Sequence, residues 1–520
     1  MLQGPFFLTT MTRRPQRLFI FLAVGLTLFG LQSCNKRSKD QKAQELYQTH
    51  CARCHITPGI DQLPRELWSE RVLPEMAARM GIKEGDYDPM KGLAFKEMET
   101  LYKWGVFPAV PTLPQEDWEI LKEYILSNAP ESIEGQIHDI QYQRQQQFVA
   151  EPMTLDSMPG SYFTFLKYDQ DNNKVWTGDI SGSLKEYDFK TGRSQLLHQV
   201  KNAVTDFTRK DSISYITDVG ILDPSELSTG KIFTAQGEQQ EALSEIFHRP
   251  VNTLVVDLDK DGIDELVISE FGYRTGRLTL MKGLPSGGYE RRMLLTQPGA
   301  IRAVAEDMNQ DGKLDIVVIT SQGDESITIL YQRDDMSFKI DKAIRFSPIY
   351  GSSWFELVDF DNDGDLDVIT VNGDNADKTY IAKPYHGLRI HINDGNNKFT
   401  EEYFYPLNGA TRFVTDDFDQ DGDYDLAVIS TFPDYENAPD LSLVYLENVN
   451  PAGFEFKSFK FDESNLSRWF LLDKGDVDND GDTDIILSAF TYVFTPVPDR
   501  FTREWEQNNV DMVVLKNRLK

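Results

Sequence analysis

Every cysteine of this 520-residue chain lies in one short stretch near its beginning. The three are Cys34, Cys51 and Cys54, and two of them belong to the run Cys51-Ala52-Arg53-Cys54-His55. A C-x-x-C-H spacing is typical of covalent c-type haem attachment, because two thioethers hold the porphyrin and the adjacent imidazole is placed to ligate iron. We therefore predict one covalent haem c on Cys51 and Cys54, with His55 as the proximal iron ligand.

A redox dithiol and half of a zinc site are the alternative interpretations of the same spacing. A zinc site needs further cysteine or histidine ligands, and none lies between His55 and His138. A thioredoxin-like dithiol belongs to a βαβ pattern, which is absent around Cys51. The haem interpretation is therefore favoured.

Five acidic loops recur in the second half of the chain. They read DLDKDGIDE, DMNQDGKLD, DFDNDGDLD, DFDQDGDYD and DVDNDGDTD. Each has an acid or amide at positions 1, 3 and 5, glycine at position 6 and an acid at position 9. Alternate side chains converge on one point while the glycine permits a sharp turn, so hard oxygen ligands surround an ion of calcium size. The alternative is an acidic turn without an ion, but crowded carboxylates disfavour joint ionisation.

The predicted ligands of up to five Ca²⁺ ions are positions 1, 3, 5 and 9 of these loops. They are Asp257, Asp259, Asp261 and Glu265; Asp307, Asn309, Asp311 and Asp315; Asp359, Asp361, Asp363 and Asp367; Asp417, Asp419, Asp421 and Asp425; and Asp476, Asp478, Asp480 and Asp484.

The elements beside the acidic loops are predicted to be strands. Flanks such as RAVAED and DIVVIT are rich in β-branched residues, and an EF-hand would instead need helices and a glutamate at position 12. The loops begin 50, 52, 58 and 59 residues apart, a period typical of four-stranded propeller blades. Two weaker copies, around Asp169 and Asp206, bring the number of blades to seven, and we assign no ion to them.

The repeats resemble FG-GAP or VCBS-type propeller repeats over roughly residues 160–520. This resemblance implies an all-β, seven-bladed propeller. After the last acidic loop the sequence supplies one strand fewer than a four-stranded blade needs. An open blade would expose a sheet edge, so we predict that residues 146–157 form the missing outer strand and close the ring.

The elements that position the C-x-x-C-H run are predicted to be helices. Residues 40–50 carry apolar side chains at helical spacing, and residues 115–128 place Trp118, Leu121 and Ile125 on one face. In size, motif and helix placement, residues 38–130 resemble a small cytochrome c, which implies an all-α domain.

The cytochrome resemblance implies a distal iron ligand, which is commonly methionine. Trp68, Val72 and Met76 recur every four residues, similar to a pattern in some bacterial cytochromes whose methionine meets the iron. Met76 is therefore the predicted distal ligand, although Pro74 interrupts the same stretch. The other candidates are Met80, Met90 and Met98, the last two favoured if the ligand lies in the loop before the last helix.

The beginning of the chain has the pattern of an export signal. A basic stretch precedes Leu18 to Leu31, 14 uncharged and mostly apolar residues. A membrane helix needs roughly 20 apolar residues, so a secretory signal is the better interpretation. Leu31-Gln32-Ser33-Cys34 resembles the lipobox of bacterial lipoproteins, which implies acylation of Cys34 and attachment to a membrane; an unpaired cysteine after an ordinary signal is the alternative. The following NKRSK has no aspartate at the second position, which favours the periplasmic face of a Gram-negative outer membrane.

Net charge excludes one class of partner. The full chain has 53 basic and 83 acidic residues, a formal charge of −30, and loss of residues 1–33 would remove three arginines and leave −33. Nucleic-acid binding relies on phosphate neutralisation, so we expect no nucleic-acid partner. The acidic loops hold 23 of the 83 acids, and five calcium ions would bring −33 to −23.

The domain organisation follows. We predict a lipoprotein signal (1–33), a lipidated tether (34–37), a cytochrome c-like domain (38–130), a linker with the closing strand (131–159) and the propeller (160–520).

The sequence favours a lipid-anchored, periplasmic electron-transfer protein with an unidentified redox partner protein. Its propeller would dock that partner or another ligand. The first alternative is a dehydrogenase that binds substrate or an organic cofactor on the propeller and passes electrons to haem. The second is a glycan- or protein-binding module with a haem sensor. Fold alone does not choose among them, and no Ser-His-Asp arrangement or phosphate loop stands out as a catalytic site.

Overall fold

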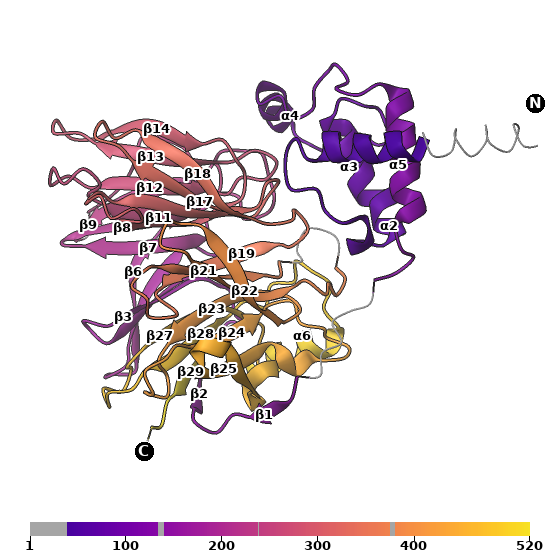
Figure 1. Cartoon of the computed structure of the whole chain (residues 1–520). Helices are drawn as coiled ribbons and strands as arrows, with labels where there is room; N and C mark the ends of the chain where they lie inside the picture. Colours follow the sequence, from indigo (N-terminus) through magenta and orange to yellow (C-terminus); the bar gives the residue numbers. More distant parts are fainter. Residues whose placement is uncertain (1–38, 134–139, 238, 375–379, 520) are drawn as a thin grey trace, which may run out of the picture.

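A computed structural model describes residues 39–133, 140–237, 239–374 and 380–519. A helical region over residues 39–133 lies against a ring of β-sheets formed by the rest of the described chain (Figure 1). The predicted signal, Cys34 and the tether of residues 34–37 lie outside the described residues.

The described β-strands form seven sheets, which confirms the predicted seven-bladed, all-β propeller. Blades 1 to 5 each take four consecutive strands and are separate sheets. Blade 1 is β3 (Phe163–Asp169), β4 (Lys174–Asp179), β5 (Ser183–Asp188) and β6 (Arg193–Gln199); blade 2 is β7 (Val204–Lys210), β8 (Ile213–Asp218), β9 (Lys231–Gln236) and β10 (Gln239–Ala242). Blade 3 is β11 (Pro250–Val256), β12 (Glu265–Glu270), β13 (Arg277–Gly283) and β14 (Tyr289–Leu295). Blade 4 is β15 (Ala300–Glu306), β16 (Asp315–Thr320), β17 (Ser326–Gln332) and β18 (Phe338–Arg345); blade 5 is β19 (Ser352–Val358), β20 (Asp367–Asn372), β21 (Gly387–Asn393) and β22 (Phe399–Pro406).

The last two blades recruit strands from the segment that precedes the propeller. Blade 6 is β23 (Ala410–Asp416), β24 (Asp425–Ser430), β25 (Leu443–Asn450) and β26 (Glu455–Lys460), extended at its outer edge by β1 (Tyr142–Arg144). Blade 7 is β27 (Trp469–Gly475), β28 (Asp484–Ala489) and β29 (Met512–Lys516), with β2 (Val149–Met153) as its outer strand.

The second strand of each blade from 3 to 7 is a run of six fully buried residues, and each of these strands begins at position 9 of an acidic loop. Sequences such as DIVVIT and DVITVN suit this position because β-branched side chains pack well between neighbouring sheets. Each acidic loop therefore connects the first and second strands of its blade, the hairpin position predicted from the sequence.

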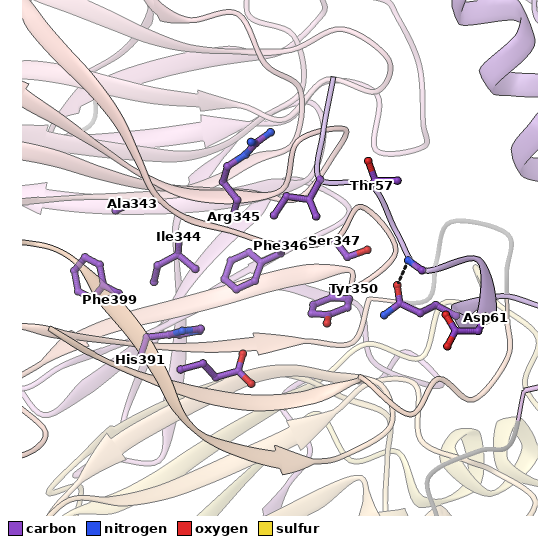
Figure 2. Close-up of a pocket in the computed structure, with 14 residues that line it drawn as sticks. Thr57, Asp61, Ala343, Ile344, Arg345, Phe346, Ser347, Tyr350, His391 and Phe399 are labelled. Atoms are coloured by element: carbon purple, nitrogen blue, oxygen red, sulfur yellow. Dashed lines mark hydrogen bonds between the residues drawn. The ribbon is translucent and has the colours of Figure 1, made fainter. Parts of the chain in front are cut away.

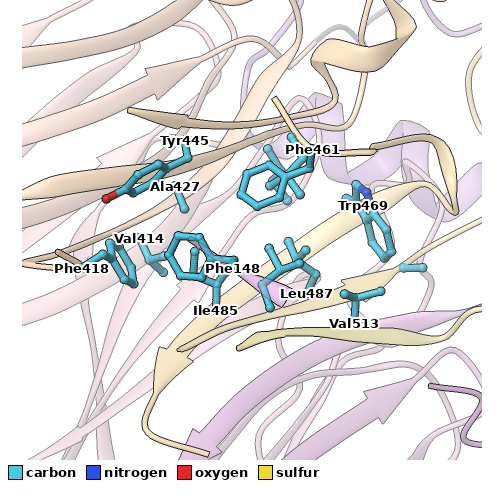
Figure 3. Packing of buried hydrophobic residues seen from close by; sticks show 14 of the residues in the cluster. Phe148, Val414, Phe418, Ala427, Tyr445, Phe461, Trp469, Ile485, Leu487 and Val513 are labelled. Atoms are coloured by element: carbon cyan, nitrogen blue, oxygen red, sulfur yellow. The ribbon is translucent and has the colours of Figure 1, made fainter. Parts of the chain in front are cut away.

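β2 completes the last blade and lies within the stretch 146–157 that was expected to close the ring. It runs antiparallel to β29, from the pair Val149–Lys516 to the pair Met153–Met512. Phe148, just before β2, is 7% exposed and packs between blades 6 and 7 with Phe418 and Tyr445 (Figure 3).

Two elements of the propeller and its linker were not predicted from the sequence. β1 pairs with β26 in parallel, so the linker contacts blade 6 before it reaches blade 7. The helix α6 (Asp499–Asn508) lies between β28 and β29 and buries Phe501 and Trp505. Phe501 and Trp505 are four residues apart and follow Pro498, a pattern typical of a helix, but only strands were predicted in this part of the chain.

The helical region has one apolar core. A helix spans residues 39–51, and the others are α2 (Arg65–Leu67), α3 (Leu73–Arg79), α4 (Phe95–Lys103) and α5 (Gln115–Asn128), with a 3-10 turn, η1 (Ile60–Gln62), after the first. α5 coincides with the predicted helix, and its Trp118, Leu121 and Ile125 are at most 1% exposed.

Pro74 does not end the helix that was predicted to carry Met76. The helical backbone continues from α2 into α3 through a π turn, η2 (Trp68–Val72), in which the Leu73 N–H bonds to the Trp68 carbonyl. A π turn adds one residue to the helical repeat, and this widening lies directly before the proline that lacks an N–H donor.

The helical region and the propeller contact each other through specific hydrogen bonds and ion pairs, and we call this interface the seam. Glu97 of α4 accepts hydrogen bonds from the Ser225 hydroxyl (2.8 Å) and the Glu226 N–H (3.1 Å). Glu75 of α3 forms an ion pair with Arg274 (3.3 Å). These contacts reach the loops between β8 and β9 and between β12 and β13.

A second set of seam contacts involves blades 4 and 5. The Tyr385 hydroxyl donates to the Gln62 carbonyl (3.1 Å), and Ile349 packs against the core of the helical region. Because the contacts come from several blades, the position of the helical region on the propeller is specified by side chains as well as by the linker.

Candidate haem and metal sites

The C-x-x-C-H run begins where the first helix ends. Cys51 is the last helical residue and is half-buried against the core of the helical region, whereas Cys54 is exposed in the turn that follows. Within the described residues both thiols are free. Burial raises the pKa of the Cys51 thiol to about 12, so the unmodified side chain is neutral.

The next residue, His55, is held in one tautomer. Its Nδ1 lies 2.8 Å from the Ile56 carbonyl oxygen, and because a carbonyl only accepts, Nδ1 carries the proton. The Nε2 lone pair is therefore left available for a metal, which is the arrangement that orients ligating histidines in proteins. The Tyr47 hydroxyl donates to the Pro58 carbonyl and anchors the segment after His55 to the first helix.

The structure separates the four candidate methionines into two pairs. Met76 and Met80 pack against the same apolar core as Cys51. Met90 and Met98 are half-buried but are not part of that cluster, and Met98 lies within the helix α4 and not in the loop before the last helix, where it was expected. The cluster thus contains the predicted distal ligand, Met76, and one alternative, Met80.

The acidic loops share one backbone conformation. Residue 4 of each loop has a φ of 56° to 62°, and the glycine at position 6 has a φ of 85° to 99°, a region that favours glycine. In blade 3 the two carboxylate oxygens of Asp257 accept from the N–H groups of Asp261 (3.1 Å) and Gly262 (3.0 Å). The chain therefore folds around the first carboxylate of the loop.

The acid at position 9 ties the loop to its blade. In blade 5, Asp367 accepts from the Phe360 N–H (2.9 Å) through one oxygen and from the Asn393 N–H of β21 (2.8 Å) through the other. Asp315, Asp425 and Asp484 make the corresponding pair of bonds in blades 4, 6 and 7. All four carboxylates are fully buried, so they have a structural role as well as a predicted ligand role.

Four of the five loops bring three carboxylates together with ligand oxygens within 4.8 Å of one another. The groups are Asp257, Asp259 and Glu265; Asp359, Asp361 and Asp367; Asp417, Asp419 and Asp421; and Asp476, Asp478 and Asp484. In the described residues the loop of blade 4 forms no such group, since position 3 is Asn309 and Lys313 pairs with Asp311 (3.3 Å). The predicted ligands Asp261, Asp363, Asp480 and Asp425 lie in the loops but outside these groups.

Lysines near the loops distinguish the four groups. Lys282 pairs with Asp259 (2.8 Å) in blade 3, and Lys516 lies 3.9 Å from Asp478 in blade 7. Among the ion pairs of the described residues, none involves an acid of the loops in blades 5 and 6. Those two groups are the least neutralised.

Burial makes the ionised loops unfavourable on their own. Burial and, to a smaller extent, neighbouring carboxylates raise the pKa of Asp367 to about 6 and the pKa of Asp425 and Asp484 to about 7. Several buried carboxylate oxygens also have no hydrogen-bond partner among the described residues: Asp259 Oδ1, Glu265 Oε1, Asp359 Oδ1, Asp423 Oδ1 and Asp482 Oδ1. Oxygens left without a donor can instead be satisfied by a cation.

Comparison with known proteins supports the repeat assignment. Residues 307–370 match the model of the FG-GAP-like repeat, a span that runs from the acidic loop of blade 4 through that of blade 5. The comparison with curated protein sequences gives no match.

Several solved structures are similar in outline. The Neurospora crassa Pan2 WD40 domain is 10% identical with a TM-score of 0.44, covering 73% of this chain and 99% of its own. Saccharomyces cerevisiae Sqt1 is 12% identical with a TM-score of 0.39, covering 68% and 83%. The computationally designed Ika8 protein is 13% identical with a TM-score of 0.37, covering 65% and 84%. These TM-scores are low, so the seven-bladed ring is assigned from the strand pairing of this chain alone.

One further observation concerns the membrane. Across the described segments, no helix is both long enough and apolar enough to span a bilayer.

Proposed function

We propose that the protein is a c-type cytochrome whose haem-bearing helical region is fused to a calcium-binding propeller. The observation that carries the proposal is the turn after the first helix, where two free thiols precede an imidazole whose Nδ1 is held by a backbone carbonyl. The donor set fits haem c: Cys51 and Cys54 would hold it, and His55 and Met76 would supply the proximal and distal iron ligands.

Haem bound there would supply reversible one-electron transfer. The chain itself would orient the proximal ligand through the bond between His55 Nδ1 and the Ile56 carbonyl. The apolar core around Cys51 and Met76 would exclude water from one side of the site, and a methionine ligand would raise the reduction potential. Electrons would pass to a redox partner protein.

The test of the haem proposal is expression together with a c-type maturation system. We expect one haem per chain that stays attached after denaturation and acid-acetone extraction. The variant Cys51→Ala/Cys54→Ala should lose it, whereas Ala52→Ser, which leaves both thiols and the imidazole, should keep it. Extraction of the haem from the unmutated protein would overturn the covalent assignment.

The propeller loops are proposed to bind calcium. Converging carboxylates in four loops, together with buried carboxylate oxygens that lack donors, support a divalent cation held by oxygen ligands. The loop of blade 4 offers Asp307, Asn309, Asp311 and Asp315 and would be the weakest of up to five sites.

Export and lipid attachment complete the proposal. Cys34 would be acylated and would hold the protein at the periplasmic face of a bacterial membrane. Cys34→Ser should then yield a soluble periplasmic protein. Retention of that variant in membranes after a salt wash would contradict the anchor.

A second function, in which the haem accepts electrons from a bound substrate, is favoured by one observation. A pocket lies directly beside the residues that follow His55, between the helical region and blades 4 and 5. Haem reduction on adding a candidate substrate to the purified protein would support a dehydrogenase, and absence of reduction would favour an electron carrier.

A further inference from the structure

The pocket at the seam, which we call the seam pocket, has a volume of about 630 Å³. This volume is within the range of small-molecule sites, roughly 300–1,000 Å³. Residues 56–62 form one wall, and β18, β21 and β22 with the loop after β18 form the others (Figure 2). The contacts of Tyr385 with Gln62 and of Ile349 with the helical core flank it, so the pocket is a preformed part of the fold.

The cations around the seam pocket are already neutralised. Arg345 donates to one oxygen of Asp324 through Nε (3.0 Å) and Nη2 (2.6 Å). Arg389, whose side chain is 4% exposed, pairs with Glu401 at 3.2 Å. A free anion would therefore find no unpaired positive charge here.

Acceptors are available on opposite walls. Asp61 is exposed on the helical side, and it makes no ion pair among the described residues. Glu401, on the propeller side, contacts Arg389 through one carboxylate oxygen and has a side chain that is 47% exposed. Carboxylates accept strong hydrogen bonds from hydroxyl groups.

The remaining walls are rings and aliphatic side chains. Phe399 lies at one end of the pocket, and Phe346 meets the His391 ring edge-on, with ring centroids 5.8 Å apart (Figure 2). Burial lowers the pKa of His391 to about 3, so this ring is neutral at physiological pH. Tyr350 is fixed by stacking on Tyr385 with centroids 5.1 Å apart.

We propose that the seam pocket binds a neutral saccharide, whose hydroxyl groups donate to Asp61 and Glu401 and whose apolar ring face packs on Phe399. The paired cations disfavour an anion, and the carboxylate acceptors favour a ligand rich in hydroxyl donors. The aromatic and aliphatic walls favour a ligand that is partly apolar. The proposal is independent of haem and calcium binding, since none of these residues is a predicted ligand of either.

The test is calorimetric titration of the full-length, calcium-loaded protein with glucose, galactose, mannose, N-acetylglucosamine, maltose and cellobiose. We expect at least one of these sugars to bind with one-to-one stoichiometry and a Kd in the millimolar range or below. Asp61→Asn and Glu401→Gln should each weaken binding at least about tenfold, the loss expected for one hydrogen bond to a charged group. Phe399→Ala should also weaken binding, because the sugar would lose the ring on which its apolar face packs.

The matched control is Glu402→Gln. Glu402 is an exposed acid next to Glu401 on β22, but it does not line the seam pocket. Its substitution should leave the Kd unchanged.

Charged analogues decide the ligand class. Tighter binding of glucosamine or glucuronate than of glucose would overturn the neutral assignment in favour of a cation or an anion. Lack of binding by every neutral sugar would overturn the proposal, and binding that the pocket variants do not weaken would move the site elsewhere. The haem spectrum and the effect of calcium on the Tm report separately on the proposed function, so either proposal can fail without the other.

Discussion

Lys516 of the last strand lies directly opposite Val149 of a strand that precedes the first blade. The Lys516 ammonium also pairs with Glu151 of the same strand at 2.9 Å. The two ends of the repeat region are therefore held in one sheet, and release of β2 would leave the edge of β29 open.

The first prediction concerns this closure. Phe148→Ala should lower the free energy of unfolding of the propeller by about 3–5 kcal/mol, the cost typical of truncating a buried phenylalanine. Val149→Ala is the control, because Val149 is 37% exposed and should cost less than about 1 kcal/mol. Chemical denaturation followed by far-UV circular dichroism measures both.

A truncation tests the same point. A chain that begins at residue 140 keeps β1 and β2, whereas a chain that begins at residue 160 loses them. The second should melt at a clearly lower temperature, and equal melting temperatures would contradict closure by β2.

The second prediction concerns removal of calcium. A ligand that binds only the folded state stabilises it by RT ln(1 + [L]/Kd), about 2.7 kcal/mol per site at a hundredfold excess over Kd. Chelation should therefore lower the Tm measured by scanning calorimetry, and added calcium should restore it. Magnesium is the control cation, since it prefers a smaller octahedral site and should restore less. Identical melting curves with and without chelator would contradict the proposal.

The third prediction ranks the loops. Asp361→Ala and Asp419→Ala, in blades 5 and 6, should each remove a tight site, because no lysine of the described ion pairs neutralises these groups. Asn309→Ala, in blade 4, should remove only a weak site, because Lys313 already pairs with Asp311. Calcium titration of each variant counts the tight sites, and loss of one in Asn309→Ala would reverse the ranking.

The fourth prediction is a pH dependence. Burial raises the pKa of Asp425 and Asp484 to about 7, so without calcium the folded protein holds more protons than the unfolded chain between about pH 4 and 7. These groups therefore make the calcium-free protein less stable as the pH rises through that window. Calcium binds the ionised form, and its affinity should fall by about tenfold per pH unit for each proton displaced below pH 7. Calcium titrations at pH 8 and pH 6 measure this, and equal affinities would exclude these carboxylates as ligands.

The fifth prediction separates the methionines. Met76→Ala should lower the reduction potential and change the ferric absorption spectrum, because the iron would lose its thioether ligand. Met90→Ala is the control, since Met90 lies outside the cluster that contains Cys51. An unchanged Met76→Ala spectrum together with a changed Met80→Ala spectrum would transfer the role to Met80.

The repeat architecture could be predicted because its signal is local and repeated. Each acidic loop requires a turn with glycine at position 6, and strands of β-branched residues must follow it. Regular spacing of these units then specifies the number of blades. The helix α5 could be predicted equally well, because Trp118, Leu121 and Ile125 recur at helical spacing and are buried together on one face.

Pairing between distant segments left weaker traces in the sequence. β1 has three residues, and its parallel partner β26 lies more than 300 positions away, so neither periodicity nor turn chemistry indicates the pairing. The π turn before Pro74 is another example: a proline normally predicts a helix end, and the packing of Trp68 and Leu73 in the helical core accompanies the continuation.

The sequence by itself determined the elements whose residues lie close together: the C-x-x-C-H run, the acidic hairpin loops and the repeat of the blades. Tertiary structure alone decided that Met76 and Met80, but not Met90, join Cys51 in one core, that lysines neutralise some loops and not others, and that residues 56–62 face Glu401 and Phe399 across a pocket. The physical reason is that local geometry is encoded in spacing along the chain, whereas these contacts depend on how separate elements pack.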